Sequence, residues 1–154
     1  MGSPTGPDRA GVAHVLLVDL NKSGLAARRT VLEELGHRVT TASCGEDALL
    51  HFSKAKFDLV ITDHRMAKLN GTELIKKLRA VEPAMPVIMI SAYVDALGLN
   101  ESNTGANLVL AKSANEVAHL IRGVARLLRQ KSKAKKKPPA SLGGSALKAR
   151  RQTS

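Results

Sequence analysis

The sequence of 154 residues is poor in the residues that make disulfide scaffolds and aromatic binding surfaces. Its one cysteine, Cys44, excludes an internal disulfide and a cysteine-rich zinc site. With no tryptophan, one tyrosine and two phenylalanines, the core has to be built from aliphatic side chains and methionine. No apolar run approaches the roughly 18 residues that span a bilayer, and the N-terminus lacks the layout of a secretion signal. The expected location is the cytoplasm.

Acidic residues are missing from the C-terminal end of the chain. Eight of the 24 basic residues lie between Gln130 and Ser154, where there is no acidic residue. Residues 1–129 carry 16 basic and 13 acidic side chains, so most of the net charge of +11 belongs to the last segment. We expect residues 130–154 to form a disordered basic tail, and residues 1–11 to form a disordered leader. Such a tail either only solubilises the protein or makes non-specific, salt-sensitive contacts with nucleic acid or anionic lipid.

Apolar segments alternate with helix-forming segments between residues 12 and 129. The expected strands are 12–18, 38–42, 57–62, 87–90 and 108–111. The expected helices are 23–35, 45–54, one that begins at Gly71, a poor one over 93–103 that contains Gly98 and Asn100, and 114–129. This alternation predicts a single α/β domain over residues 12–129, in which a parallel sheet is covered by helices on both faces.

Polar side chains follow four of the expected strands at the point where each strand ends. They are Asp19, Asp63, Ser91 and Lys112. Ligands of an open parallel sheet bind beyond the carboxyl ends of its strands, so we expect these side chains to lie close together. The set suits phosphorylation of a carboxylate: Asp63 is the candidate nucleophile, Asp19 the candidate metal ligand, and Ser91 and Lys112 the candidate partners of the phosphoryl oxygens. The simpler alternative is a group of solvated turn residues.

Several motifs recur in the same order and spacing in one known family. They are Glu33-Glu-Leu-Gly36, Gly45-Glu-Asp-Ala-Leu49, Phe57-Asp-Leu-Val-Ile-Thr-Asp63, Asn70-Gly71, Pro86-Val-Ile-Met-Ile-Ser-Ala92 and Lys112. Over roughly residues 13–129 the chain resembles the CheY-like receiver domains of two-component response regulators. The resemblance implies a flavodoxin-like, doubly wound, five-stranded parallel sheet in the order 2-1-3-4-5. It also implies that Asp63 is the phosphoacceptor, and that Mg²⁺ is held by Asp19, Asp63 and the backbone carbonyl of Arg65.

The chain departs from the family pattern at several positions. Receivers usually end their first strand with two adjacent acidic residues, and here the second is Leu20. We therefore expect weak Mg²⁺ binding, because a leucine side chain offers no oxygen ligand. The amide oxygen of Asn21 is the alternative ligand at this strand end. Ala67 and Ser113 replace two customary prolines, and Val109 replaces the aromatic residue of the switch position.

The leading functional prediction is a stand-alone receiver, not an enzyme, that accepts a phosphoryl group on Asp63. The donor is expected to be a histidine kinase or phosphotransfer protein, and the output an unidentified partner protein. A pseudo-receiver that works without phosphorylation is the first alternative, and a tail-mediated binder of nucleic acid or anionic surfaces is the second. A small enzyme is disfavoured because there is no glycine-rich phosphate loop. We also hypothesise that the guanidinium of Arg65, or Lys112, partly replaces the metal's charge beside Asp63.

Overall fold

The computed structural model describes residues 12–136. Its strands are β1 (His14–Val18), β2 (Arg38–Ala42), β3 (Leu59–Thr62), β4 (Val87–Ser91) and β5 (Leu108–Ala111). Its helices are α1 (Lys22–Glu34), α2 (Gly45–Lys54), α3 (Gly71–Val81), α4 (Val94–Leu97), α5 (Glu101–Thr104) and α6 (Glu116–Lys136). The expected leader over residues 1–11 lies outside the described residues.

The strands form one parallel sheet in the order β2-β1-β3-β4-β5, so the predicted fold class and strand order are confirmed. The register pairs Val18 with Thr62 on the two central strands, β1 and β3. The residues that follow, Asp19 and Asp63, therefore emerge side by side. On the far side of β3, Ser91 pairs with Ala111, and this pairing brings Lys112 to the same edge of the sheet.

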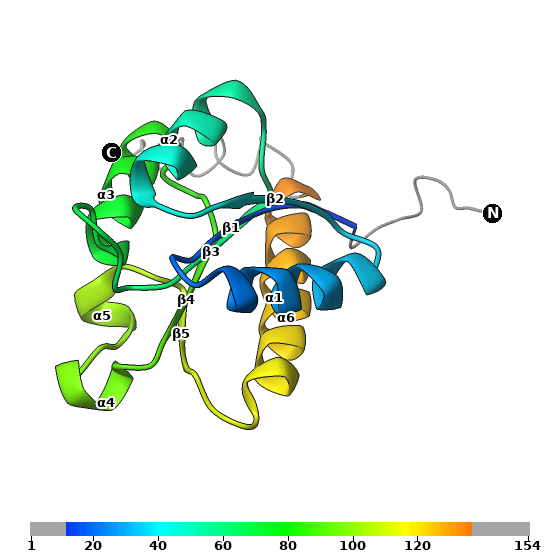
Figure 1. The fold of residues 1–154 in the computed structure, drawn as a ribbon. Helices are drawn as coiled ribbons and strands as arrows, with labels where there is room; N and C mark the ends of the chain where they lie inside the picture. The colour runs from blue at the N-terminus through cyan, green and yellow to red at the C-terminus, as the bar shows by residue number, and fades with distance from the viewer. Residues whose placement is uncertain (1–11, 137–154) are drawn as a thin grey trace, which may run out of the picture.

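The sheet is sandwiched between two apolar layers. Helices α1 and α6 cover one face, and α2, α3 and α5 lie on the other (Figure 1). The central strands are buried on both faces, because their alternate side chains enter opposite layers: Leu16 and Val60 pack toward α2 and α3, while Leu17 and Ile61 pack toward α1 and α6. Burial on both faces explains why these strands read as continuous apolar runs in the sequence.

The expected poor helix over residues 93–103 is broken into two single turns. Gly98 adopts a left-handed conformation (φ 62°) that ends α4, and Asn100 caps the start of α5 by accepting from the Asn103 N–H at 2.8 Å. The carboxylate of Glu101 then accepts the backbone N–H of Val109 at 3.0 Å. The half-buried Val109 side chain packs against the core layer of α2 and α3.

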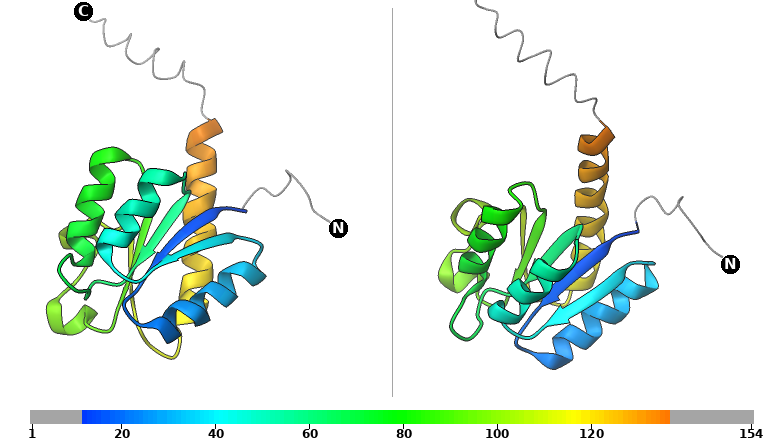
Figure 2. Two further views of the ribbon diagram at one scale, coloured as in Figure 1. Left: turned by 45° about the horizontal axis from the view of Figure 1, so that its top comes forward. Right: turned by 90° about the horizontal axis from the view of Figure 1, so that it is seen from above.

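Helix α6 is longer than the sequence analysis predicted. We expected it to end at Arg129 and to be followed by disorder, yet it continues to Lys136 and projects past the sheet (Figure 2). The prediction of disorder from residue 130 is thus wrong for residues 130–136, where lysine, alanine and glutamine are all good helix formers. In this extension the Lys131 ammonium contacts Asp58 at 3.4 Å. The rest of the expected tail, residues 137–154, lies outside the described residues.

A clamp built by Arg79 joins the end of α3 to the loops that precede β4 and β5. Its guanidinium donates to the carbonyls of Met85 and Gly105, both at 2.9 Å, and to the Asn107 side chain at 2.8 Å. Asn107 also accepts the backbone N–H of Val87 at 2.8 Å. These contacts fix the starts of the two strands whose other ends deliver Ser91 and Lys112.

Candidate functional site

The two strand-end carboxylates lie side by side and are almost entirely shielded from solvent. Asp19 is 1% exposed and Asp63 is 8% exposed. Each uses its Oδ1 atom to accept a nearby backbone N–H: Asp19 from Asn21 at 2.9 Å, and Asp63 from His64 at 2.7 Å. In each case the Oδ2 atom remains for side-chain partners. The predicted convergence of Asp19 and Asp63 is thus present.

Lys112 bridges the two carboxylates. Its Nζ atom donates to Asp63 Oδ2 at 2.9 Å and to Asp19 Oδ2 at 3.3 Å. The Lys112 backbone is held by a hydrogen bond from its N–H to the Ser91 carbonyl at 3.0 Å, so β4 positions the lysine at the end of β5. One ammonium group thus contacts both carboxylates.

The two carboxyl groups differ in their pKa values. Burial raises the pKa of Asp63 above its ordinary value, and the nearby Asp19 charge adds to this rise, which Lys112 and the His64 N–H only partly oppose. Burial would also raise the pKa of Asp19, but the Asn21 N–H together with the charges of Lys112 and Arg28 lowers it below the ordinary value. Burial alone would lower the pKa of Lys112, and its two carboxylate partners outweigh this and raise it. Asp19 therefore has the lower pKa of the two and keeps its negative charge to lower pH than Asp63 does.

Arg28 and Glu116 belong to this site and were missed by the sequence analysis. The Arg28 guanidinium donates from Nη1 to Asp19 Oδ2 at 2.8 Å, and from Nε and Nη2 to the two oxygens of Glu116 at 2.5 and 3.2 Å. Arg28 is only 8% exposed, although it is a charged residue. These contacts tie β1, α1 and the start of α6 together through one side chain.

A signal for Arg28 was present in the sequence. Leu25, Arg28, Leu32 and Leu35 share one helical face, and a charged residue in an apolar stripe has to find a partner when the stripe is buried. Leu25 and Leu32 are indeed buried against the sheet, whereas Leu35 remains 43% exposed. The partner Glu116 could not have been found in this way, because 88 positions separate it from Arg28.

Two of the predicted site residues, Ser91 and Arg65, contact Tyr93. Ser91 is fully buried, and its Oγ atom accepts the Tyr93 N–H at 3.0 Å. The guanidinium of Arg65 lies over the Tyr93 ring, 4.6 Å from its centroid. Lys112, not Arg65, is therefore the cation placed against Asp63. The roles predicted for the Ser91 hydroxyl and for the Arg65 carbonyl stay predictions.

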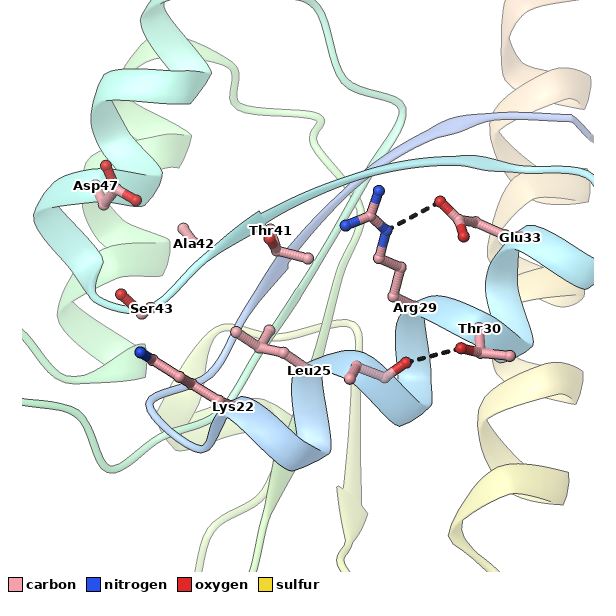
Figure 3. Close-up of a pocket in the computed structure, with 10 residues that line it drawn as sticks. Lys22, Leu25, Arg29, Thr30, Glu33, Thr41, Ala42, Ser43 and Asp47 are labelled. Carbon is pink, nitrogen blue, oxygen red and sulfur yellow. Dashed lines mark hydrogen bonds and ion pairs between the residues drawn. The ribbon is translucent and has the colours of Figure 1, made fainter.

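A groove between α1 and β2 is separate from these carboxylates. Its lining includes Lys22, Arg29, Thr41 and Asp47 (Figure 3). Arg29 follows Arg28 directly in α1 but forms an exposed pair with Glu33 at 3.0 Å, one helical turn away. The adjacent arginines thus have different surroundings, and only Arg28 reaches the strand-end carboxylates.

A five-stranded 2-1-3-4-5 sheet with Asp63, Asp19 and Lys112 at one edge is the arrangement expected of a signalling receiver. The family profile described as "Response regulator receiver domain" matches residues 15–123. The chain therefore belongs to the response regulator receiver domain family, whose members interact with histidine kinases and output proteins. Across residues 12–136, no helix is long and apolar enough to cross a membrane.

Two individual proteins are similar in sequence to part of this chain. The chain is 34% identical over 83 residues to the transcriptional regulatory protein ZraR of Salmonella typhimurium, a match that covers 54% of this chain and 19% of that protein. It is 46% identical over 70 residues to the virulence sensor protein BvgS of Bordetella bronchiseptica, covering 46% of this chain and 6% of that protein. The chain thus spans about a fifth or less of the length of these relatives.

Solved receiver structures match over most of the described chain. A response regulator receiver domain protein from Clostridium thermocellum has 27% identity and a TM-score of 0.71, with 80% of this chain and 99% of that chain covered. The chemotaxis response regulator CheY4 of Vibrio cholerae has 29% identity and a TM-score of 0.68, with 75% of this chain and 98% of that chain covered. Both likenesses extend over nearly the whole of those chains.

Receiver domains generally bind Mg²⁺ at their acidic site, but the residues of this chain do not fit the ion as they are arranged. Mg²⁺ requires oxygen ligands in near-octahedral positions. Leu20 offers none and points its side chain outward at 54% exposure. The Asn21 amide oxygen accepts the Gly24 N–H at 2.8 Å and caps α1 instead. Within residues 12–136, no group of three His, Cys, Asp or Glu residues is arranged to hold a metal ion.

Proposed function

We propose that this receiver accepts a phosphoryl group on Asp63 from a histidine kinase or phosphotransfer protein and signals by binding a partner protein. The observation that carries the proposal is the Asp63 carboxylate at the end of β3 with the Lys112 ammonium 2.9 Å away. A buried carboxylate with one strong cationic partner combines a nucleophile with a charge that can bind phosphoryl oxygens.

The proposed reaction needs only simple displacement at phosphorus. A carboxylate oxygen of Asp63 forms a bond to phosphorus while the bond from phosphorus to the donor's histidine nitrogen breaks. The electron pair of the broken bond stays on the imidazole, which takes a proton. Lys112 supports the new acyl phosphate because its ammonium can bind a phosphoryl oxygen in place of the Asp63 oxygen. The chain is an acceptor in this scheme, and we propose no enzymatic turnover of its own.

We further propose that Mg²⁺ binds weakly and that the receiver works in the cytoplasm. Leu20 removes one acidic ligand, which supports the first of these proposals. Ser91 is proposed to contact the phosphoryl group, because its hydroxyl lies at the end of the strand beside β3.

Acetyl phosphate or beryllofluoride, supplied with Mg²⁺, tests this function. Intact mass should show one added phosphoryl group on the wild-type chain, and ¹⁹F NMR should show bound beryllofluoride. Asp63→Asn should abolish both signals, because the amide nitrogen and neutral oxygen are poor nucleophiles. Asp47→Asn is the matched control, since Asp47 is an exposed helical carboxylate that contacts His51. Labelling that persists in Asp63→Asn would refute the assignment of the acceptor.

A pseudo-receiver that signals without phosphorylation is the second candidate. The observation that favours it is that both oxygens of Asp19 already accept hydrogen bonds, from Asn21, Arg28 and Lys112. This function predicts no mass increase in wild type at millimolar concentrations of acetyl phosphate and Mg²⁺. It also predicts that Asp63→Asn leaves binding of the output partner unchanged.

Non-specific binding of nucleic acid is a third candidate, and it rests on the basic side chains of α6. Arg122, Arg126, Arg129 and Lys133 recur at intervals of three or four residues along this helix. Binding of a DNA duplex by the full chain should weaken steeply as salt rises. Replacement of Arg122, Arg126 and Arg129 by glutamine should reduce the salt dependence, because fewer phosphates are then neutralised. A full chain without DNA binding at low salt excludes this candidate.

A further inference from the structure

Arg28 is the most unusual charged residue among the described residues, because it lies in the apolar face of α1 and is nearly buried. All three of its guanidinium nitrogens donate hydrogen bonds, one to Asp19 and two to Glu116. The two contacts to Glu116 form a side-on fork, which fixes the plane of the guanidinium as well as its position. The Arg28 side chain is therefore held in one position beside Asp19 by its hydrogen bonds.

The charges of the site form an alternating chain. Glu116 contacts Arg28, Arg28 contacts Asp19, Asp19 contacts Lys112, and Lys112 contacts Asp63. Every direct neighbour in this order has the opposite charge. A divalent cation between Asp19 and Asp63 would face two cations already in contact with these carboxylates, and an ion bound through Asp19 Oδ2 would compete with both of its donors.

Gly24 leaves room for the Arg28 guanidinium beside Asp19. A Cβ atom at this position would lie 2.9 Å from Arg28 Nη1 and 3.5 Å from Asp19 Oδ2. Glycine is a poor helix former, and Gly24 lies in the first turn of α1. The missing side chain therefore opens the path by which the guanidinium reaches Asp19.

We propose that Arg28 is the resident cation of this acidic site: it holds Asp19 where a divalent ion would otherwise be needed, and it competes with Mg²⁺ so that the ion binds only weakly. In this proposal Leu20 leaves the ligand set without one carboxylate, and Arg28 supplies a covalently attached positive charge to the same site.

Mg²⁺ binding, measured alone by backbone amide shifts in ¹⁵N-labelled protein, tests the proposal without any phosphorylation. Wild type should show shifts near Asp19 and Asp63 only at high Mg²⁺ concentrations. Arg28→Met should lower the apparent Kd by about tenfold or more, because it removes a positive charge that contacts Asp19 and repels the ion at short range. Arg29→Met removes the same charge one position away, and its Kd should equal that of wild type.

Gly24→Ala provides a variant that keeps every charge and favours the helix. The new Cβ atom should displace the flexible end of Arg28 from Asp19, so the Kd for Mg²⁺ should also fall. Because alanine raises helix propensity, this variant remains informative where Arg28→Met fails to fold. An unchanged Kd in folded Arg28→Met or in Gly24→Ala would overturn the proposal.

Leu20→Asp separates the missing ligand from the resident cation. If Arg28 competes with the ion, Leu20→Asp alone should gain less Mg²⁺ affinity than the double variant with Arg28→Met. Full recovery of affinity by Leu20→Asp alone would refute the role of Arg28.

A second consequence rests on the proposed function: acetyl phosphate should label Asp63 equally well with Mg²⁺ and with EDTA. Labelling that strictly requires Mg²⁺ would overturn Arg28 as the substitute cation. If no labelling occurs under either condition, the proposed function fails, while the Kd series still decides whether Arg28 competes with the metal.

Discussion

Gly71 sets how closely α3 approaches the loop that carries Asp63, and replacing it with alanine should be costly. An added Cβ atom would lie 2.4 Å from the Asp63 carbonyl oxygen and 2.9 Å from both His64 Cα and Met89 Cε. Two of these three atoms are backbone, so they cannot rotate away. The helix is also held in place, because the Gly71 N–H donates to the His64 carbonyl at 2.8 Å.

The magnitude follows from overpacking against a fixed backbone. Such overpacking costs about 1–3 kcal/mol, and a contact as short as this one belongs at the upper end. The better helix propensity of alanine returns at most about 1 kcal/mol. Gly71→Ala should therefore lower the free energy of unfolding by about 2 kcal/mol, which corresponds to roughly 5–10 °C in Tm for a domain of this size.

Gly123→Ala is the matched control within α6. Its added Cβ atom would lie 2.5 Å from Leu108 Cδ2 and 3.6 Å from Ile88 Cδ1. The close atom is the tip of a half-buried side chain that can rotate, so the gain in helix propensity of about 1 kcal/mol should offset most of the cost. Urea unfolding of the two variants provides the comparison. Equal stabilities for Gly71→Ala and Gly123→Ala would show that the backbone contact at Asp63 does not control the packing of α3.

Two further predictions concern residues outside the site. Arg79→Lys keeps the charge but cannot donate to all three acceptors of the guanidinium, so it should lower the free energy of unfolding in urea by about 2 kcal/mol. Arg29→Lys, at an exposed position, should lower it by less than about 0.5 kcal/mol. Burial lowers the pKa of His37, despite the opposing charge of Asp58, so the unfolded chain binds more protons and stability should fall as pH drops below 6.5. His37→Asn, which can still accept the Ala13 N–H, should flatten this dependence in unfolding measured between about pH 8 and pH 5; a slope as steep as that of wild type would contradict it.

Most of the fold could be predicted from the sequence because the strands β2 and β5 and the helix α2 are marked by local patterns. The boundaries expected for these three elements match the observed ones. The weak α4 region was also predictable, since Gly98 and Asn100 favour a helix end and a new cap. The length of α6 was not, because a lysine-rich segment satisfies the composition of a disordered tail and the propensity of a helix at once.

The acidic edge of the site was predictable for a different reason. Strand ends in a parallel sheet meet at one edge, so the apolar runs before Asp19 and Asp63 were enough to place the carboxylates together. The contact between Arg28 and Glu116 depends on how α1 and α6 pack on the same face of the sheet. No local pattern encodes that packing.

A resident arginine changes how the site depends on its surroundings. An Mg²⁺ site is filled only to the extent that the concentration of free ion exceeds its Kd, whereas a side chain of the same chain has a high and constant effective concentration. The fork to Glu116 adds to this advantage, because the guanidinium is oriented before any ligand arrives. The positive charge beside Asp19 is therefore always present. Burial and the nearby Asp19 charge raise the pKa of Asp63 above its ordinary value. Lys112 contacts both carboxylates, so a continuous series of charged contacts runs from Asp63 through Asp19 and Arg28 to Glu116 at the start of α6.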